Sequence, residues 1–153
     1  MLLKKLSIVT DNFQNAKQFM FYHLKLDGNG GVLPYQWNLS QGTMPKCFYL
    51  DPISGIISGR SAENGQFYFS IKLTDSSMPI KTTTRSFSIN VLPETERIEG
   101  DINQDNNIDL KDIIIIQKLL SDYPISPVGF VDINGNCYTD LRELIYLMEV
   151  VGY

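Results

Sequence analysis

The stretch GQFYFSIKLTD, Gly65–Asp75, alternates apolar and polar side chains. Successive side chains of a β-strand point to opposite faces of its sheet, so this period of two predicts a long strand with one face in a hydrophobic core. The side chains expected on the core face are Phe67, Phe69, Ile71 and Leu73. Those expected on the other face are Tyr68, Ser70 and Lys72.

The residues around this strand carry the same signals. The stretch RSFSINVLP, residues 85–93, repeats the alternation with Phe87, Ile89 and Val91. Clusters of turn-forming residues interrupt the chain at 27–31, 51–55, 62–66 and 74–79. Short strands separated by turns at this spacing are typical of an all-β sandwich. The sequence therefore predicts an all-β domain over residues 1–93.

Two residues of this half have competing interpretations. Trp37, the one tryptophan of the chain, is expected in the core of the sandwich, and a sugar-stacking platform is the alternative. Asp75 is expected to organise a turn, and a cadherin-like calcium ligand is the alternative.

The pattern changes after Pro93. Residues 94–99 are polar and predict a linker, followed by a second small domain over residues 100–153. In this domain apolar residues recur at helical spacing, which predicts two amphipathic helices. The apolar faces expected on the first helix are Leu110, Ile113, Ile114 and Leu120, and also Ile116, Leu119, Leu120 and Tyr123; the face expected on the second is Leu141, Leu144, Ile145 and Met148. Pro124 is expected to end the first helix.

The second domain contains an internal repeat. The stretches DINQDNNIDLKDIIII, from Asp101, and DINGNCYTDLRELIYL, from Asp132, match at the same offsets from their first aspartate. Each copy joins an acidic loop to an amphipathic helix. One such loop could be a solvated turn that caps a helix, but two copies in register favour a pair of metal sites.

The donor pattern of both loops suits calcium. Calcium takes roughly six to eight oxygen ligands, which a twelve-residue loop supplies from its positions 1, 3, 5, 7, 9 and 12, the seventh through a backbone carbonyl. The first loop would use Asp101, Asn103, Asp105, the carbonyl of Asn107, Asp109 and Asp112. The second would use Asp132, Asn134, Asn136, the carbonyl of Tyr138, Asp140 and Glu143.

The two loops differ in charge and at position 6. That position turns sharply with a positive φ, which Asn106 tolerates better than Cys137 does. The first loop also has four acidic ligands and the second has three. The sequence therefore predicts that calcium binds more tightly in the first loop, and leaves open whether the second is occupied.

Charge and length exclude several classes of function. The formal net charge of −4 divides into +3 for residues 1–98, with ten basic and seven acidic residues, and −7 for residues 99–153, with three basic and ten acidic residues. An acidic tail repels phosphate, so no nucleic acid partner is expected.

No apolar run is long enough for membrane insertion, and no export signal is visible at the N-terminus. No nucleophile or phosphate-loop motif is present, so no catalytic residues are expected.

Cys47 and Cys137 are the two cysteines, too few for a disulfide framework. The sequence leaves open whether they are paired.

Residues 100–151, with the opening GDINQDNNIDLKD, resemble a dockerin. Dockerins have two calcium loop-helix repeats, each a half EF-hand without the entering helix. The resemblance implies two calcium sites at the residues named above and a cohesin-like protein module as the partner. The sequence leaves the oligomeric state open, with a monomer as the default. In that family, positions 10 and 11 of each loop largely choose the partner and are often small hydroxyl residues; here they are Leu110, Lys111, Leu141 and Arg142.

Residues 1–93 resemble the Ig-like, dystroglycan-type cadherin-like domain of bacterial surface and secreted proteins. The stretches that carry this resemblance are GGVLPYQWNLSQGTMP, LDPISGIISGRSAENGQFYFSIKLTDSS and FSINVL. The family implies a β-sandwich spacer or adhesion module without catalysis.

The expected fold class is therefore two small domains, an all-β Ig-like sandwich followed by an α-helical, dockerin-like pair of calcium loops. The expected function is a non-catalytic, calcium-binding module of a secreted or cell-surface bacterial protein that mediates docking or adhesion. The alternatives are a calcium-stabilised structural cap, or the non-catalytic tail of an extracellular polysaccharide-degrading enzyme. The chain is expected to be the C-terminal piece of a longer exported protein, or the product of a gene truncated at its front.

Overall fold

The computed structural model describes residues 4–95, 98–121, 132 and 135–152. The chain divides into two compact units, Met1–Pro93 and Glu94–Tyr153. Each unit is described by itself.

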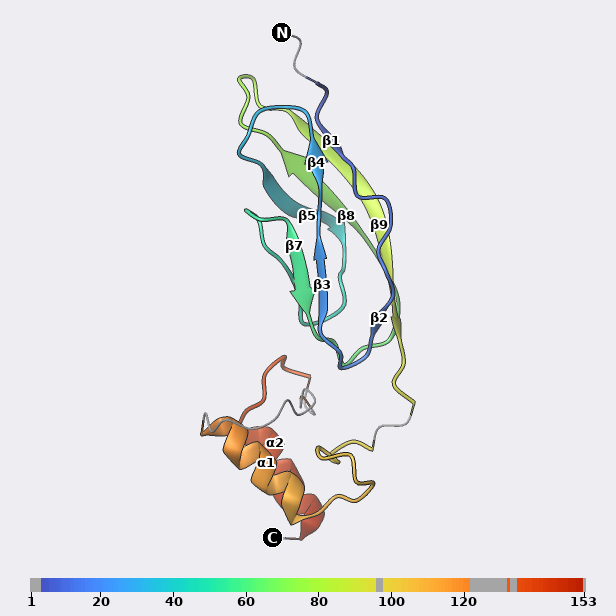
Figure 1. Cartoon of the computed structure of the whole chain (residues 1–153), viewed down its shortest axis with the longest axis vertical. Coiled ribbons are helices and arrows are strands. Elements are labelled where there is room, and N and C mark those ends of the chain that lie inside the picture. The colour runs from blue at the N-terminus through green and yellow to red at the C-terminus, as the bar shows by residue number, and fades with distance from the viewer. Residues whose placement is uncertain (1–3, 96–97, 122–131, 133–134, 153) are drawn as a thin grey trace. The chain divides into compact units, whose positions relative to one another are not determined.

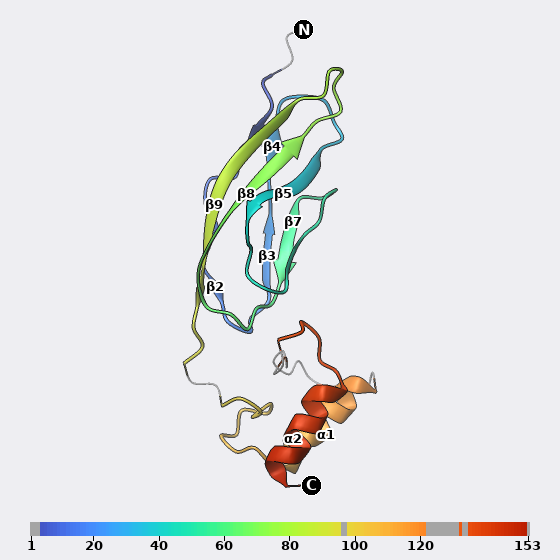
Figure 2. The same ribbon diagram turned by 180° about the vertical axis from the view of Figure 1, so that it is seen from behind.

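Unit 1 consists of short strands connected by turns (Figure 1). Their bounds are β1 (Ser7–Ile8), β2 (Ala16–Lys17), β3 (Tyr22–Lys25), β4 (Gly28–Asn29), β5 (Gln36–Gly42), β6 (Phe48–Leu50), β7 (Ile56–Gly59), β8 (Gly65–Thr74) and β9 (Thr82–Leu92). One sheet has the order β2-β9-β8-β5, a second has the order β3-β7-β6, and β1 pairs with β4. The two larger sheets face each other, as Figures 1 and 2 show from opposite sides. The predicted β-sandwich is confirmed.

Strands β8 and β9 form the longest ladder of the sandwich. They pair antiparallel, and Phe69 lies opposite Phe87 while Phe67 lies opposite Ile89. Inward-pointing side chains of both strands lie in the core, as their alternation predicts. The outward-pointing Ser70 is also buried, and its hydroxyl is satisfied by a 2.9 Å hydrogen bond with that of Ser86 on the neighbouring strand.

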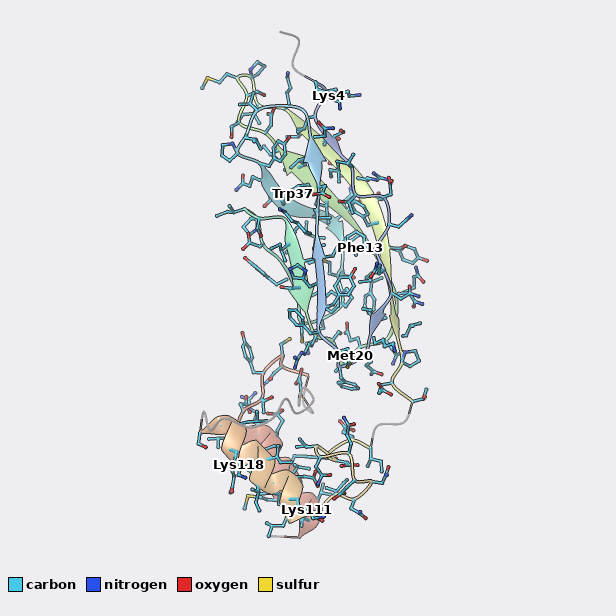
Figure 3. The ribbon with its side chains drawn as sticks, viewed as in Figure 1. Lys4, Phe13, Met20, Trp37, Lys111 and Lys118 are labelled. Carbon is cyan, nitrogen blue, oxygen red and sulfur yellow. The ribbon has the colours of Figure 1, made fainter. Side chains whose placement is uncertain are left out.

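Trp37 is buried between the sheets (Figure 3), with 3% of its surface exposed. It lies on β5, and its ring meets that of Tyr35 edge to face at 6.4 Å between centroids. The core interpretation of Trp37 is confirmed, because a buried indole cannot stack on a sugar ring.

Asp75 organises the turn that follows β8. Its Oδ1 accepts hydrogen bonds from the backbone N of Ser77 and of Lys81 and from the hydroxyl of Ser77, and its Oδ2 accepts one from the N of Val32. Burial opposes ionisation of this carboxylate, but the hydrogen bonds outweigh burial and lower its pKa to about 2. The interpretation of Asp75 as a turn residue is confirmed.

Unit 2 contains two helices, α1 (Leu110–Leu120) and α2 (Leu141–Val151). They pack side by side and run in opposite directions (Figures 1 and 2). Ile113, Ile116 and Leu147 form the buried core between them, together with Ile102 from the segment before α1. Tyr123 and the end predicted for the first helix at Pro124 lie outside the described residues.

The predicted apolar faces of the helices are too broad. Each helix buries a narrow stripe, because its one helical neighbour in the described part of unit 2 covers a single side. Spacing alone cannot say which edge of a wide apolar face meets that neighbour. The residues predicted on the apolar faces but found exposed are Leu110, Ile114, Leu141, Ile145 and Met148.

Candidate metal centre

The last positions of each acidic loop also form the cap of the following helix. In the first loop the Oδ1 of Asp109 accepts from the N of Lys111, and the Oδ2 of Asp112 accepts from the N of Asp109. In the second loop the Oδ1 of Asp140 accepts from the N of Arg142, and the Oε2 of Glu143 accepts from the N of Asp140. These reciprocal bonds are capping boxes, which satisfy backbone N–H groups that a helix start leaves open.

The first position of each loop holds the turn together. The two oxygens of Asp101 accept from the N of Asp105, at 3.1 Å, and of Asn106, at 2.7 Å. Asp132 does the same with the N of Asn136 and of Cys137, both at 2.9 Å. Both aspartates are buried. The loops therefore share one geometry around their first carboxylate.

Both loops turn through left-handed backbone at the same two positions. The φ angle is +61° at Gln104 and +67° at Asn106 in the first loop. It is +70° at Gly135 and +77° at Cys137 in the second. The positive φ expected at position 6 is present in both loops, although Cys137 adopts it at a higher steric cost than Asn106 does.

In the first loop a lysine lies between two of the predicted calcium ligands. The Nζ of Lys111 donates to the Oδ2 of Asp105 at 2.9 Å and lies 3.0 Å from the Oδ2 of Asp109. Its hydrogen bond, followed by one from Asn103, lowers the pKa of Asp105 to about 2. The two carboxylates raise the pKa of Lys111.

In the second loop a neutral amide takes the corresponding place. The Nδ2 of Asn136 donates to the Oδ2 of Asp140 at 2.8 Å, and its Oδ1 accepts from the N of Tyr138. The pKa of Asp140 is lowered, most of all by the hydrogen bond from the N of Arg142.

The carboxylates at position 12 differ most between the loops. Both Asp112 and Glu143 have 0% of their surface exposed. The Oδ1 of Asp112 accepts from the N of Ile102 and of Asn103, so both of its oxygens have donors. The Oε1 of Glu143 is buried and has no hydrogen-bond partner in the described part of the chain. A buried oxygen of a carboxylate is costly without a donor or a cation, so this atom fits a cation ligand.

The structure brings the predicted ligands of each loop together as far as it describes them. In the first loop the oxygens of Asp101, Asn103, Asp105, Asp109 and Asp112 are linked through shared backbone or side-chain hydrogen bonds, and Asn107 donates to Asp105. In the second loop Asp132, Asn136, Asp140 and Glu143 are linked in the same way, and the side chain of Tyr138 points to solvent. Asn134 lies outside the described residues.

The sequence interpretation missed the contacts of Lys111. It considered this residue only as a departure from the small hydroxyl residues usual at the partner-choosing positions of dockerins. The spacing could have predicted these contacts, since Lys111 follows Asp109 by two residues and Asp105 by six. At the start of α1 its side chain reaches back to both carboxylates.

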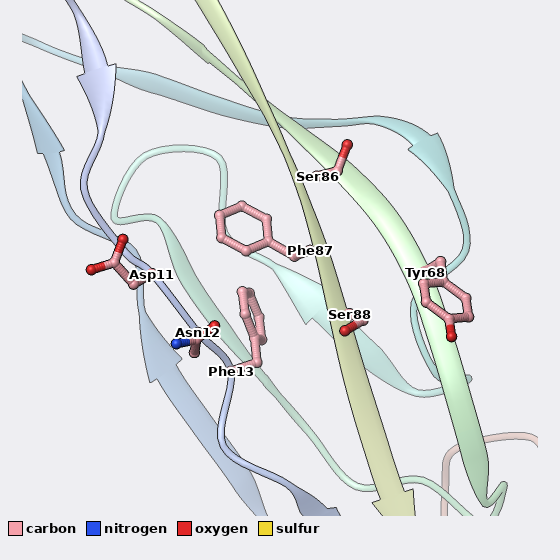
Figure 4. Close-up of a pocket in the computed structure, with 7 residues that line it drawn as sticks. All are labelled: Asp11, Asn12, Phe13, Tyr68, Ser86, Phe87 and Ser88. Atoms are coloured by element: carbon pink, nitrogen blue, oxygen red, sulfur yellow. The ribbon is translucent and has the colours of Figure 1, made fainter.

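Unit 1 has a shallow pocket beside β9, with a cavity volume of about 330 Å³ (Figure 4). Its walls are residues 11–13 and side chains of β8 and β9, among them Tyr68 and Phe87. Its single acidic residue, Asp11, forms an ion pair with Arg85 at 2.9 Å. The pocket therefore lacks the two carboxylates that glycoside hydrolysis uses.

Among the described residues, no helix is long and apolar enough to span a membrane.

The family model described as Putative Ig domain matches residues 5–92. A comparison with curated protein sequences gives no match.

Solved structures resemble the chain at low sequence identity. A "putative alpha-galactosidase" of Bacteroides fragilis NCTC 9343 is 20% identical with a TM-score of 0.50, over 60% of this chain and 19% of that one. A "putative alpha-galactosidase/melibiase" of the same organism is 22% identical with a TM-score of 0.49, over 56% of this chain and 17% of that one. The third cadherin domain of human protocadherin 7 is 20% identical with a TM-score of 0.40, over 49% of this chain and 71% of that one. This chain thus spans less than a fifth of the length of the two bacterial proteins, and the likeness concerns the fold.

Proposed function

This chain belongs to the Putative Ig domain family through residues 5–92, and from that premise we propose that it is a non-catalytic, calcium-binding module of a secreted or cell-surface protein. The sandwich is the spacer or adhesion part. Unit 2 is a dockerin-like pair of calcium loops that docks the parent protein to a partner.

The buried Oε1 of Glu143 carries the calcium proposal. It has no hydrogen-bond partner, although the other oxygen of the same carboxylate accepts from the N of Asp140 at 2.8 Å. An unpaired buried carboxylate oxygen destabilises the fold by roughly 1–3 kcal/mol or more. Position 12 is the place where a calcium loop contributes a carboxylate with both oxygens, so a bound cation would remove this penalty.

The donor set supports the same ion. Carboxylate and amide oxygens at alternating loop positions are the ligands of hard cations such as calcium. Calcium would supply positive charge that offsets the repulsion between the carboxylates of each loop. Asp101 and Asp132 would hold the two turns, and Asp112 and Glu143 would tie each loop to its helix.

Calcium binding and helix formation would then be coupled. The capping residues Asp109 and Asp140 belong at once to a loop and to a helix start, so ordering a loop also orders its helix. The expected result is a far-ultraviolet circular dichroism signal that falls when a chelator is added and returns with calcium.

The fluorescence of Trp37 separates the two units in this experiment. The chain has one tryptophan, and it is buried in unit 1. The proposal predicts that the chelator lowers the helix signal while the tryptophan emission stays unchanged. An unchanged helix signal in the chelator would contradict a structural role for calcium.

The docking proposal is supported by apolar side chains left exposed at matching positions of the two repeats. Leu110 and Ile114 on α1 correspond to Leu141 and Ile145 on α2, at the same offsets within each repeat. Exposed apolar residues on a small domain mark a candidate protein contact. A cohesin-like module is the proposed partner.

A pull-down with purified cohesin modules tests the docking proposal. Capture is expected in calcium, and loss of capture is expected for the double substitution Leu141→Asp and Ile145→Asp. The matched control is Glu149→Lys, an exposed residue of α2 outside that pair. Calcium-dependent helices without capture would support instead a calcium-stabilised structural cap.

A second candidate function is the non-catalytic tail of a polysaccharide-degrading enzyme. It is favoured by the fold likeness to the α-galactosidase described above, in which the matched region is 19% of the chain. The genomic sequence upstream of Met1 tests it: a catalytic domain encoded in the same reading frame would support this candidate.

A further inference from the structure

The two acidic loops carry the same local charge once Lys111 is counted. The first loop has four carboxylates, at Asp101, Asp105, Asp109 and Asp112, and the Lys111 ammonium reduces their total from −4 to −3. The second loop has three carboxylates and a total of −3, because the Arg142 guanidinium forms no ion pair with a described carboxylate and acts on Asp140 only at longer range. The acid count that favours the first loop therefore disappears in the folded chain.

We propose that Lys111 is an internal competitor of calcium in the first loop, so that the second loop fills first and more tightly. This inference rests on the proposed calcium-binding function and concerns the order and affinity of its two sites. It reverses the order predicted from the number of acidic ligands.

The position of the Lys111 ammonium carries the first part of the argument. It lies 2.9 Å from the Oδ2 of Asp105 and 3.0 Å from the Oδ2 of Asp109, which are the proposed ligands at positions 5 and 9. A cation entering between these oxygens must displace the ammonium, which has two charge-assisted contacts to lose. Calcium binding in the first loop is thus an exchange of one cation for another.

The second loop has no such competitor among its described residues. Arg142 occupies the position of the second repeat that corresponds to Lys111, but no ion pair joins its guanidinium to a described carboxylate. The Oδ2 of Asp140 accepts instead from the neutral amide of Asn136. Only one partner of this bond is charged, whereas the contacts of Lys111 join two opposite charges, so the entering cation displaces no competing cation there.

The carboxylates at position 12 favour the same order. Both oxygens of Asp112 accept from backbone N–H groups, of Ile102 and Asn103 on one side and of Asp109 on the other. The Oε1 of Glu143 has no partner to give up among the residues that the structure describes. The second loop therefore gains a cation ligand without losing a hydrogen bond, whereas the first loop does not.

The competition should weaken binding without preventing it. The Lys111 side chain is 65% exposed, so its ammonium can move into water. Ion pairs at an exposed side chain are weak, so the loss of two predicts that Lys111 weakens calcium binding in the first loop by roughly tenfold.

Calorimetric titration of the full chain with calcium, after treatment with a chelator, tests the inference. The wild type is expected to show a tighter and a weaker site. Asp132→Ala should remove the tighter site and Asp101→Ala the weaker one. Lys111→Met, which keeps the length of the side chain but not its charge, should tighten the weaker site roughly tenfold. The matched control Arg142→Met should change both sites by less than about twofold.

Each other outcome overturns a defined part of the argument. If Lys111→Met leaves both affinities unchanged, or if Asp101→Ala removes the tighter site, the inference is wrong while calcium binding itself stands. If the wild type and all variants bind no calcium, the proposed function fails, and the inference fails with it.

Discussion

Gly55 lies in contact with the indole ring of Trp37: a Cβ atom built on Gly55 would come 2.7 Å from Nε1 and 2.8 Å from Cε2 of the ring. Its φ angle is +69°, a left-handed conformation that glycine adopts without strain. Gly55 therefore both turns the chain before β7 and lets the backbone pass against the core tryptophan. This explains the glycine that begins the stretch GIISG, residues 55–59.

Gly55→Ala is expected to destabilise unit 1 by roughly 3 kcal/mol, because it adds a clash with Trp37 to the cost of a left-handed alanine. Urea unfolding followed by the emission of Trp37 measures this loss. Gly65→Ala is the matched control: its φ is +112°, but a Cβ there meets no atom within 4 Å. It should cost only the backbone strain, roughly 1–2 kcal/mol. Equal losses for the two variants would contradict a packing role for Gly55.

Asp75→Asn is expected to destabilise unit 1 near neutral pH, because the substitution removes a carboxylate that accepts four hydrogen bonds. The pKa of Asp75 is lowered from 3.8 to about 2 in the folded chain. The ionised form therefore stabilises the fold fully above the unfolded pKa, and this contribution disappears as the pH falls toward 2.

The measurement is urea unfolding of the wild type and of Asp75→Asn over this pH range, again by Trp37 emission. The difference between them should shrink on acidification. Asp27→Asn serves as the control, since Asp27 is exposed and its carboxylate accepts no hydrogen bond from a described residue. A difference that stays constant down to about pH 2 would show that the charge of Asp75 does not act as described.

Tyr22→Phe should leave unit 1 as stable as the wild type or stabilise it by up to about 1 kcal/mol at neutral pH. The Tyr22 hydroxyl is buried without a hydrogen-bond partner, while its ring stacks on Phe48 at 5.2 Å between centroids, a contact that phenylalanine keeps. Burial raises the pKa of Tyr22 from 10.0 to about 12, so ionisation favours the unfolded chain.

The advantage of Tyr22→Phe should consequently grow as the pH rises from 10 to about 12, since only the wild type loses stability by ionising at this position. Thermal unfolding at several alkaline pH values checks this. Tyr68→Phe, at an exposed tyrosine on β8, is the comparison. A Tyr22→Phe variant clearly less stable than the wild type at neutral pH would indicate that the hydroxyl has a partner.

Glu143→Gln is expected to act with opposite signs with and without calcium. In a chelator the variant should be at least as stable as the wild type, because a neutral amide replaces a buried carboxylate with an unpartnered oxygen. In calcium the variant should lose most of the stabilisation that the ion provides, because position 12 no longer supplies an anionic ligand. The measurement is the melting temperature of the helix signal in both conditions. Calcium raising it equally in both proteins would exclude Glu143 as a ligand.

The strands of unit 1 could be predicted from the sequence because their signal is local. Each strand of the β8 and β9 ladder carries its own alternation, and the pairing of Phe69 with Phe87 keeps both on the core face. The burial of Ser70 could not be predicted in this way, since its partner Ser86 belongs to the next strand. Its outward position looks polar and exposed in the sequence alone.

The acidic loops could also be predicted from the sequence, because their donors follow a fixed spacing and occur twice.

The sequence alone determined the strand periodicity, the repeat of loop and helix, and the set of oxygen donors, which all depend on neighbours along the chain. Only the tertiary structure decided that Leu141 is exposed while Leu147 is buried, that Lys111 reaches Asp105 and Asp109, and that Glu143 retains an unpartnered oxygen. These relationships depend on how a helix meets its neighbour and on how a loop folds back on its helix, and side chains that meet in space leave no periodic signal in the sequence.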